Sequence, residues 1–152
     1  MKKLFLTLTI LFVTLNYTNA NVQVKTILEG NINAKIKLIV YESLTCSHCA
    51  SFHEDIYPKL KKDFIDTGLA KIEFRNFPLD LAAFNASKIA HCKNDGKSNI
   101  LHFLFSNQKE WVRGETIEDL NKNLKKLINE QNFGISYDKC INDKNIEDHV
   151  LN

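Results

Sequence analysis

Two cysteines of this chain, Cys46 and Cys49, have a spacing that allows reversible redox chemistry. The β-rich run Lys37 to Tyr41 precedes them, and apolar residues recur at helical spacing after them, so the pair is predicted to open a helix directly behind a strand. Cysteines three residues apart at the mouth of a helix carry their sulfurs on the same side of its first turn, where a disulfide can close with little strain. The spacing and its context together favour dithiol–disulfide exchange.

The two thiols are expected to differ in reactivity because they occupy different places in the predicted helix. Cys46 lies at the helix end, where unpaired backbone N–H groups and the positive end of the helix dipole stabilise a thiolate. His48, between the cysteines, can add a second positive or hydrogen-bond-donating partner. We therefore expect the pKa of Cys46 to lie well below the ~8.5 of a free cysteine, and Cys46 to be the nucleophile. Cys49, one turn further in and facing the core, is predicted to be the resolving thiol.

Other uses of a Cys-x-x-Cys pair fit this sequence less well. A zinc site needs two further ligands, and His53, Cys92 and Cys140 offer no second clear pair. A c-type haem needs histidine directly after the second cysteine, where Ala50 stands. We therefore expect no metal and no organic cofactor, since the cysteines themselves carry the electrons. The alternative function is that of a non-catalytic metal-binding or remnant interaction domain.

The cysteine pair is predicted to lie in a β-α-β unit. Strands are expected at Val22 to Leu28, Lys37 to Tyr41 and Ala70 to Phe77, and the last two should be parallel because a helix connects them. That helix is expected to begin after a cap at Thr45 and to be kinked by Pro58. One of its faces is predicted to be apolar. The residues of that face are Cys49, Phe52, Ile56, Leu60 and Phe64.

The rest of the chain is predicted to be helical. The expected helices are Leu79 to Lys93, Asn99 to Ser106, Thr116 to Glu130 and Ser136 to Leu151. Thr116 and Asp119 form a weak capping pattern, and Ser136 is a candidate cap. Cys92 lies in the first of these helices and Cys140 in the last. The four cysteines of the chain allow three pairings, which the residues alone leave open.

The first twenty residues have the layout of a secretory signal peptide. Met1 to Lys3 is basic, Leu4 to Leu15 is nearly all apolar or threonine, and Thr18-Asn19-Ala20 is a small-x-small cleavage site. The apolar run is too short to span a bilayer, and an uncut membrane anchor is the alternative. Cleavage is expected to leave a domain of residues 21–152 in the periplasm, with no membrane span and with conditions that permit disulfides.

The charge of the predicted mature domain argues against polyanionic partners. Removal of Lys2 and Lys3 would take the formal net charge from +2 to zero. A neutral domain gives no electrostatic reason to expect binding to nucleic acid or to an anionic membrane. The hydrophobic fraction of 44% is typical of a globular core.

Several segments of the chain resemble the DsbA-like proteins of the bacterial periplasm, which belong to the thioredoxin superfamily. These segments are Gly30-Asn31, Ile39 to His53 with its Cys-Ser-His-Cys element, and Arg75 to Leu79. The resemblance covers about residues 22–152. It implies a thioredoxin-like α/β fold with an all-helical domain inserted at about residues 80–152.

The resemblance also implies an activity and partners. Proteins of this kind are thiol-disulfide oxidoreductases that oxidise, or less often isomerise, disulfides in exported proteins. The partners would be reduced or unfolded exported proteins and a membrane thiol oxidoreductase that reoxidises the pair. Ala90-His91-Cys92 and Cys140 resemble an extra cysteine pair that some members carry in their helical domain. This implies a structural disulfide between Cys92 and Cys140, with two buried free thiols as the alternative.

Three features depart from that family. Ser47 stands where proline is common, which should tune the redox potential, and Val40 stands at a strand position that often holds a buried acid. The family also places a cis-proline loop opposite the cysteine pair, whereas only Pro58 and Pro78 occur here. The C-terminal strands and final helix of the fold are therefore expected to be missing. In that case Lys37 to Tyr41 would expose an apolar strand edge, and exchange by this chain would be weak.

The remaining titratable residues near the pair receive mostly structural interpretations. His53 lies on the cysteine-bearing face of the helix and is expected to pack or to form hydrogen bonds at the solvent edge. Glu42, near the end of the strand, is a weaker candidate for relaying protons to Cys49. His102 shows no partner pattern in the sequence.

Overall fold

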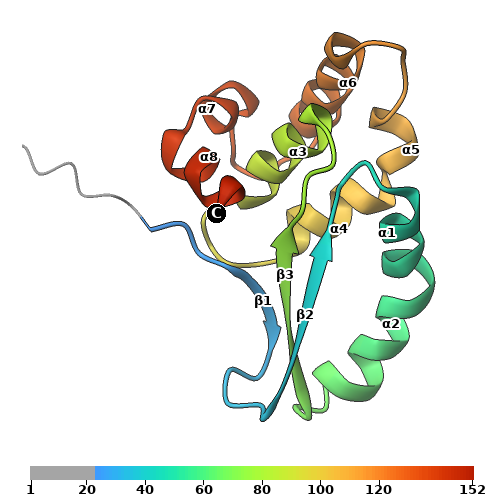
Figure 1. Cartoon of the computed structure of the whole chain (residues 1–152), viewed down its shortest axis with the longest axis vertical. Helices are drawn as coiled ribbons and strands as arrows, with labels where there is room; N and C mark the ends of the chain where they lie inside the picture. The colour runs from blue at the N-terminus through green and yellow to red at the C-terminus, as the bar shows by residue number, and fades with distance from the viewer. Residues whose placement is uncertain (1–22) are drawn as a thin grey trace, which may run out of the picture.

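The protein is described by a computed structural model that covers residues 23–152, so the predicted signal peptide at residues 1–20 lies outside the described residues. Three strands form one sheet: β1 (Ile27–Gly30), β2 (Ile36–Glu42) and β3 (Ala70–Asn76). Their order is β1-β3-β2 (Figure 1). β3 runs antiparallel to β1 and parallel to β2, which confirms the predicted β-α-β unit.

A glycine allows the tight turn between β1 and β2. Gly30 adopts a φ of +95°, a conformation that side chains with a Cβ rarely take. A Cβ at this position would also lie 2.8 Å from the carbonyl oxygen of Ala70. Glycine at the end of β1 is therefore required by both the backbone angle and the close approach of β3.

The helix between β2 and β3 alternates between two geometries. It runs through α1 (Ser47–Ser51), a π-helical segment (Phe52–Ile56), α2 (Tyr57–Leu60) and a second π-helical segment (Lys61–Ile65). Pro58 lies in the first turn of α2, directly after the first π-helical segment. Since proline has no N–H to donate to the preceding turn, the widened π geometry at this place takes up the expected kink.

The π-helical segments also change which side chains face the core. Ile56 and Phe64, predicted to lie on the buried face, are 56% and 46% exposed, so that prediction is wrong. Buried instead are His53, Tyr57 and Ile65. A π turn holds more residues than the 3.6 of an α turn, so it shifts every later side chain around the helix axis relative to the expected pattern.

The helical part beyond β3 contains six helices among the described residues. They are α3 (Leu81–His91), α4 (Asn99–Ser106), α5 (Gln108–Trp111), α6 (Ile117–Asn129), α7 (Tyr137–Ile141) and α8 (Lys144–Leu151). The predicted capping box of α6 is present, with the side chains of Thr116 and Asp119 bonded to each other's backbone N–H. The single helix predicted over 136–151 is broken, because Asp143 caps a new helix by accepting from the N–H groups of Asn145 and Ile146.

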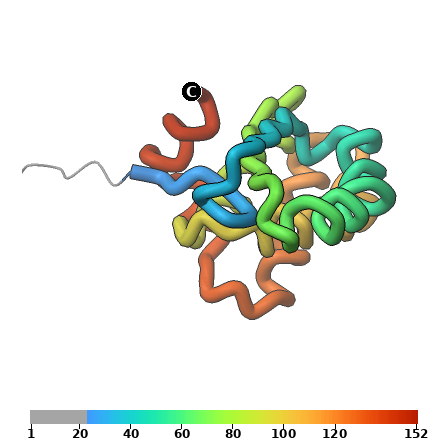
Figure 2. Tube along the Cα trace, turned by 90° about the horizontal axis from the view of Figure 1, so that it is seen from below, coloured from blue at the N-terminus to red at the C-terminus, as the bar shows by residue number. Residues whose placement is uncertain are grey.

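One hydrophobic core joins the sheet to the helices. Its fully buried members include Ile72 of β3, Ile89 of α3 and Leu104 of α4. Trp111 is also fully buried and donates its indole N–H to the carbonyl of Leu104, so it lies inside the helical part as expected. In Figures 1 and 2 the first described residues lie beside α8, where Val24 packs against Ile146 and Val150.

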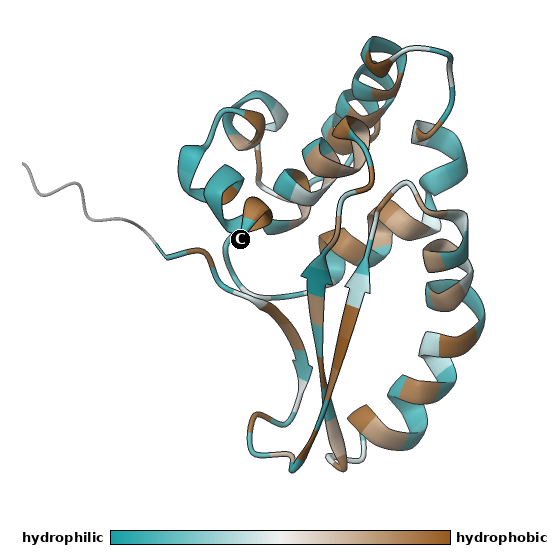
Figure 3. Cartoon of the chain, in the orientation of Figure 1, coloured by the Kyte–Doolittle hydropathy of each residue, from teal (hydrophilic) through white to brown (hydrophobic). Residues whose placement is uncertain are grey.

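Strand β2 lies at the edge of the sheet. Within residues 23–152 it pairs with β3 alone. Ile36, Ile39 and Tyr41 are 55%, 43% and 59% exposed, and Figure 3 shows the hydrophobic character along the strand. The predicted apolar edge is therefore present in the described part of the chain. No helix among residues 23–152 is long and apolar enough to cross a membrane.

Candidate active site

Cys46 lies at the first boundary of α1. It is the N-cap residue, with an extended backbone, and its carbonyl accepts the N–H of Ala50 at 3.1 Å. Thr45, the predicted cap, instead donates its hydroxyl to the Asp80 carboxylate at 2.6 Å. The helix therefore begins one residue later than expected, which brings the sulfur of Cys46 to the unpaired N–H groups of the first turn.

The surroundings of Cys46 favour its thiolate. The backbone N–H of Cys49 contributes most to lowering the pKa of Cys46. Partial burial acts in the opposite direction, but the thiol of Cys49 and the backbone N–H of His48 also lower the pKa. All three favourable groups belong to the same helical turn, so the helix end itself stabilises the charge.

Cys49 has the opposite balance. Burial is the main cause that raises its pKa, and the nearby charges of Cys46 and Glu42 raise it further. A hydrogen bond from the backbone of Ser43 opposes these effects without cancelling them. Both cysteines are free thiols in this structure. The pair therefore joins a thiol that ionises readily to one that holds its proton.

His48 is exposed, and its side chain lines a cavity of about 250 Å³ together with Glu42, Cys49 and Phe52. Its backbone N–H lowers the pKa of Cys46, as described above. The contribution predicted for its imidazole stays a prediction.

A glutamine from the helical part holds the loop before α1, and the sequence analysis did not single it out. The side-chain amide of Gln108 donates to the carbonyl oxygens of Leu44 and Cys46, at 2.8 and 3.0 Å. Gln108 is 7% exposed, and its hydrogen bond to Leu44 is buried while that to Cys46 is partly buried. Because α5 supplies this residue, the helical part directly fixes the backbone of the candidate nucleophile.

A chain of four titratable side chains runs behind the cysteine pair. Nε2 of His53 lies 2.7 Å from Oε2 of Glu42, and its Nδ1 lies 2.9 Å from Nδ1 of His102. Nε2 of His102 lies 2.7 Å from Oε1 of Glu29. The sequence interpretation of His53 as a packed, hydrogen-bonded residue is compatible with this geometry, but neither it nor that of His102 foresaw the chain. Its members come from β1, β2, the first π-helical segment and α4.

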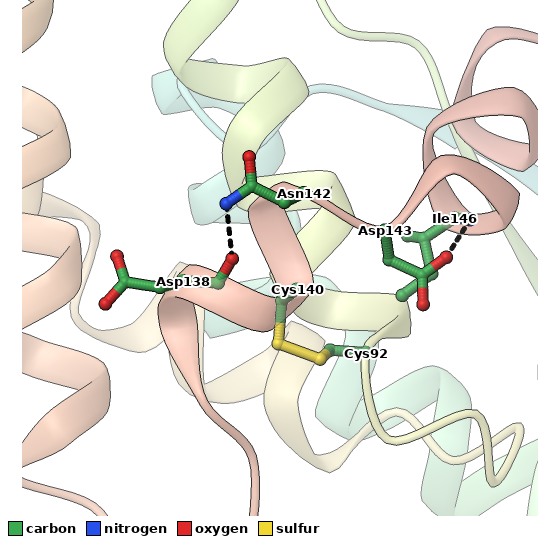
Figure 4. Close-up of a disulfide and its surroundings, with 6 residues drawn as sticks. All are labelled: Cys92, Asp138, Cys140, Asn142, Asp143 and Ile146. Carbon is green, nitrogen blue, oxygen red and sulfur yellow. Dashed lines mark hydrogen bonds between the residues drawn. A yellow bond between two sulfur atoms is a disulfide. The ribbon is translucent and has the colours of Figure 1, made fainter.

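Cys92 and Cys140 are joined by a disulfide in this structure, with their Cα atoms 5.3 Å apart. It ties the end of α3 to α7, as Figure 4 shows. Cys140 is fully buried, and the hydrogen bonds of Asn142 and Asp143 shape the turn that follows it. This pair lies in the helical part, away from the mouth of α1.

No group of three or more histidine, cysteine or acidic side chains that could hold a metal ion occurs among residues 23–152.

Comparison with known families identifies the fold. The family described as thioredoxin matches residues 22–152. The chain belongs to this thioredoxin family. Within it, the chain is similar to alpha-DsbA1 of Wolbachia pipientis, with 35% identity and a TM-score of 0.69 over 83% of this chain and 64% of the other. The DsbA-like resemblance and the α/β fold class expected from the sequence are confirmed.

Two curated relatives of this thioredoxin-family chain carry names that refer to disulfides. A Rickettsia bellii protein, provisionally named a protein-disulfide oxidoreductase, is 31% identical over 80% of this chain and 47% of its own length. Disulfide bond formation protein D of Bacillus subtilis is 30% identical over 64% of this chain and 48% of its own length. The chain thus spans about half the length of the curated relatives it matches.

Proposed function

We propose that this DsbA-like chain is a thiol-disulfide oxidoreductase that exchanges disulfides with exported polypeptides through Cys46 and Cys49. The observation that carries the proposal is the contrast within one helical turn: the pKa of Cys46 is lowered by backbone N–H groups, and that of Cys49 is raised by burial. The names of the relatives point to the same chemistry.

The exchange proceeds in two balanced steps. In the oxidised protein a substrate thiolate attacks Sγ of Cys46, the Cys46–Cys49 bond breaks, and Cys49 leaves as a thiolate that takes up a proton. A second substrate thiolate then attacks the substrate sulfur of the mixed disulfide and releases Cys46 as a thiolate. The substrate has lost two electrons and the protein has gained them. Because the helix end stabilises the Cys46 thiolate, the reduced protein is favoured and oxidation of substrates is the preferred direction.

The setting follows from the predicted signal peptide. Cleavage after Ala20 would place residues 21–152 in the periplasm. The substrates would be reduced or unfolded exported proteins, and a membrane thiol oxidoreductase would reoxidise the cysteine pair. N-terminal sequencing of periplasmic material should find Asn21 as the first residue, whereas Met1 retained in the membrane fraction would contradict export with cleavage.

Oxidation of a peptide with two cysteines tests the activity. The oxidised protein should convert the peptide to its disulfide while Cys46 and Cys49 become reduced, and Cys46→Ser should abolish the reaction. The matched control is Cys92→Ser with Cys140→Ser, which should still react. Metal content is measured on the same samples. No exchange above background, together with one bound metal per chain, would instead support the alternative of a metal-binding domain.

A further inference from the structure

The carboxylate of Glu42 is buried and only half satisfied. Its side chain is 4% exposed, and Oε2 is bonded to His53. Oε1 has no hydrogen-bond partner among the described residues. Glu42 also lines the cavity that Cys49 lines, and lies close enough for its charge to act on the Cys49 thiol. A buried carboxylate oxygen without a partner is costly, so its place beside a thiol that must gain and lose a proton calls for an explanation.

The hydrogen bonds behind Glu42 fix the number of protons in the chain. Three bonds join Glu42 to His53, His53 to His102, and His102 to Glu29, and each bond needs one proton. Two neutral imidazoles bring two protons and two carboxylates bring none. This row of side chains therefore holds one proton more than its neutral histidines supply, carried either by an imidazolium shared by His53 and His102 or by Glu42 as a carboxylic acid, and the first arrangement is the one used in the proposal below.

Glu29, at the far end of this hydrogen-bonded row of side chains, is held as an anion. Burial alone would raise the pKa of Glu29, but hydrogen bonds from His102, Ser98 and Tyr57 outweigh it and hold the pKa at about 2. Burial and the bond to Glu29 raise the pKa of Tyr57, so its hydroxyl stays a donor. Since Glu29 remains charged, the shared proton is attracted to it and can move between His53 and His102 without leaving the chain.

The two ends of the hydrogen-bonded row Glu42–His53–His102–Glu29 reach different cavities. The Cys49 end opens on the cavity of about 250 Å³ that His48 also lines. The Glu29 end lines a separate cavity of about 340 Å³ with His102, Ser98 and the lysines 61 and 97. The side chain of His102 is 26% exposed there. When a bound substrate covers the cysteine pair, the second cavity still has access to water.

We propose that Glu42 exchanges the thiol proton of Cys49, and that His53, His102 and Glu29 form a buried proton reservoir behind it. The proposal deepens the proposed function and rests on it. When Cys49 attacks Sγ of Cys46 in a mixed disulfide, its thiol proton passes to Oε1 of Glu42 through a water molecule in the cavity that both residues line, and the substrate sulfur leaves as a thiolate. Once Glu42 is neutral, it no longer attracts the positive charge to His53. The shared proton therefore moves to His102, which is bonded to the Glu29 carboxylate. When Cys49 is the leaving group, these shifts reverse.

The charged groups around the chain belong to several elements. Cys46 and Cys49 face Glu42 from the mouth of α1. Glu54 and Lys109 line a third cavity together with His53. The lysines 61 and 97 lie at the Glu29 end. The rings packed directly against His53, besides that of His102, are those of Phe52, Tyr57, Phe74 and Phe105. Its hydrogen bonds lead to the carboxylate of Glu42 directly and to that of Glu29 through His102.

The test measures the rate of one step, in which Cys49 displaces a small probe, glutathione, from a mixed disulfide with Cys46. This is called the closing step. Reduced protein is mixed with oxidised glutathione; Cys46 forms a mixed disulfide, and Cys49 then displaces glutathione. Glu42→Gln and His102→Gln keep hydrogen-bonding side chains that cannot take up a proton. Both variants should slow the closing step by about tenfold near neutral pH. The pH dependence that Glu42 and His102 together give to the closing rate should be lost in both. The control is Glu73→Gln, which neutralises an equally buried strand carboxylate bonded to Lys37 and Arg75.

Each outcome decides the proposal. His102→Gln that closes the mixed disulfide with the rate and pH profile of the parent protein would overturn it, as would an equal slowing by Glu73→Gln. Nitrogen NMR of the parent protein provides a measurement that needs no variant: His53 and His102 together should carry three ring protons at neutral pH, and two would overturn the proposal. If Cys46 fails to attack glutathione disulfide at all, the proposed function fails, whereas normal attack with unchanged closing in His102→Gln counts against the reservoir alone.

Discussion

Cys46 and Cys49 belong to one helical turn at the edge of the sheet, whereas Cys92 and Cys140 lie 48 residues apart and join two helices. The first pair is partly exposed and its two thiols differ in their affinity for a proton. In the second pair Cys140 is fully buried, and the disulfide closes a long loop of the helical part. A cysteine pair is thus suited to exchange where backbone N–H groups stabilise one of its sulfurs, and to stability where its disulfide ties distant segments together.

The largest expected effect is the trapping of a mixed disulfide, which should occur at the Cys46–Cys49 pair and not at the Cys92–Cys140 pair. Cys49→Ser, mixed with a peptide supplied as a disulfide-linked dimer, should stop at a mixed disulfide: the Cys46 thiolate opens the dimer, one peptide leaves as a thiolate, and no resolving thiol remains to displace the other. The double variant Cys92→Ala with Cys140→Ala should release the peptide normally. Mass spectrometry of the protein after reaction measures both. A stable peptide adduct at Cys92 or Cys140 in the parent protein would break the comparison.

The next effect concerns stability. The disulfide between Cys92 and Cys140 restrains a loop of 48 residues in the unfolded chain, for which the loop-entropy relation gives about 4 kcal/mol. Urea unfolding of the Cys92→Ala, Cys140→Ala variant should show a loss of this order. Cys46→Ala with Cys49→Ala in the same assay should change stability by less than about 1 kcal/mol, because those side chains are partly exposed. Equal losses of stability in the two double variants would contradict the assignment of stability to the Cys92–Cys140 pair and of exchange to the Cys46–Cys49 pair.

A third prediction tests how the helical part acts on the exchange site. Gln108→Ala leaves the carbonyl of Leu44 without this donor and removes one of the two donors of the Cys46 carbonyl, so stability should fall by about 1–2 kcal/mol and peptide oxidation by several-fold. Asn85→Ala is the matched control, since it removes a buried amide bonded to Asn121 elsewhere in the helical part. It should reduce stability similarly and leave the oxidation rate of the folded protein unchanged. An equal effect on that rate would indicate that Gln108 acts only through stability.

The smallest effect concerns His48. His48→Ala keeps the backbone N–H that lowers the pKa of Cys46 and removes the imidazole alone. The pKa should therefore rise, with the midpoint of alkylation against pH moving up by roughly half a pH unit. A lowered thiolate pKa stabilises the reduced protein above the usual thiol pKa, and this stabilisation is lost as pH falls through the lowered value. The variant should be a weaker oxidant at neutral pH, and an unchanged titration would remove the role of the imidazole.

Local signals in the sequence predicted much of this molecule. The parallel pair of strands and the capping box at Thr116 each depend on residues close together in the chain. The lowered pKa of Cys46 was also predictable, because a helix end supplies its own N–H groups. The cap itself was placed one residue early, since Thr45 bonds to Asp80, which is 35 residues away.

The histidine chain could not be predicted in the same way. Its bond between Glu29 and His102 spans 73 residues, and no periodic pattern relates them. One signal was available within β2: Val40 and Glu42 are two residues apart in the strand and so face the same side of the sheet. The strand position at Val40 lacks an acid, but the acid two residues later reaches the same side of the sheet. Gln108 gave no signal, because a buried amide is recognised only by the carbonyls that it meets.

The two π-helical segments have a consequence for how this chain tolerates insertions and deletions. A π turn contains about one residue more than an α turn, so a single deletion within Phe52–Ile56 would let the segment return to α-helical winding and would leave the later side chains close to their present directions. One further inserted residue has no such outlet and would rotate the following turns by about 100°. Tyr57 would then leave Glu29, and Ile65 would leave the core. Among homologues, this segment should therefore be found one residue shorter more readily than one residue longer.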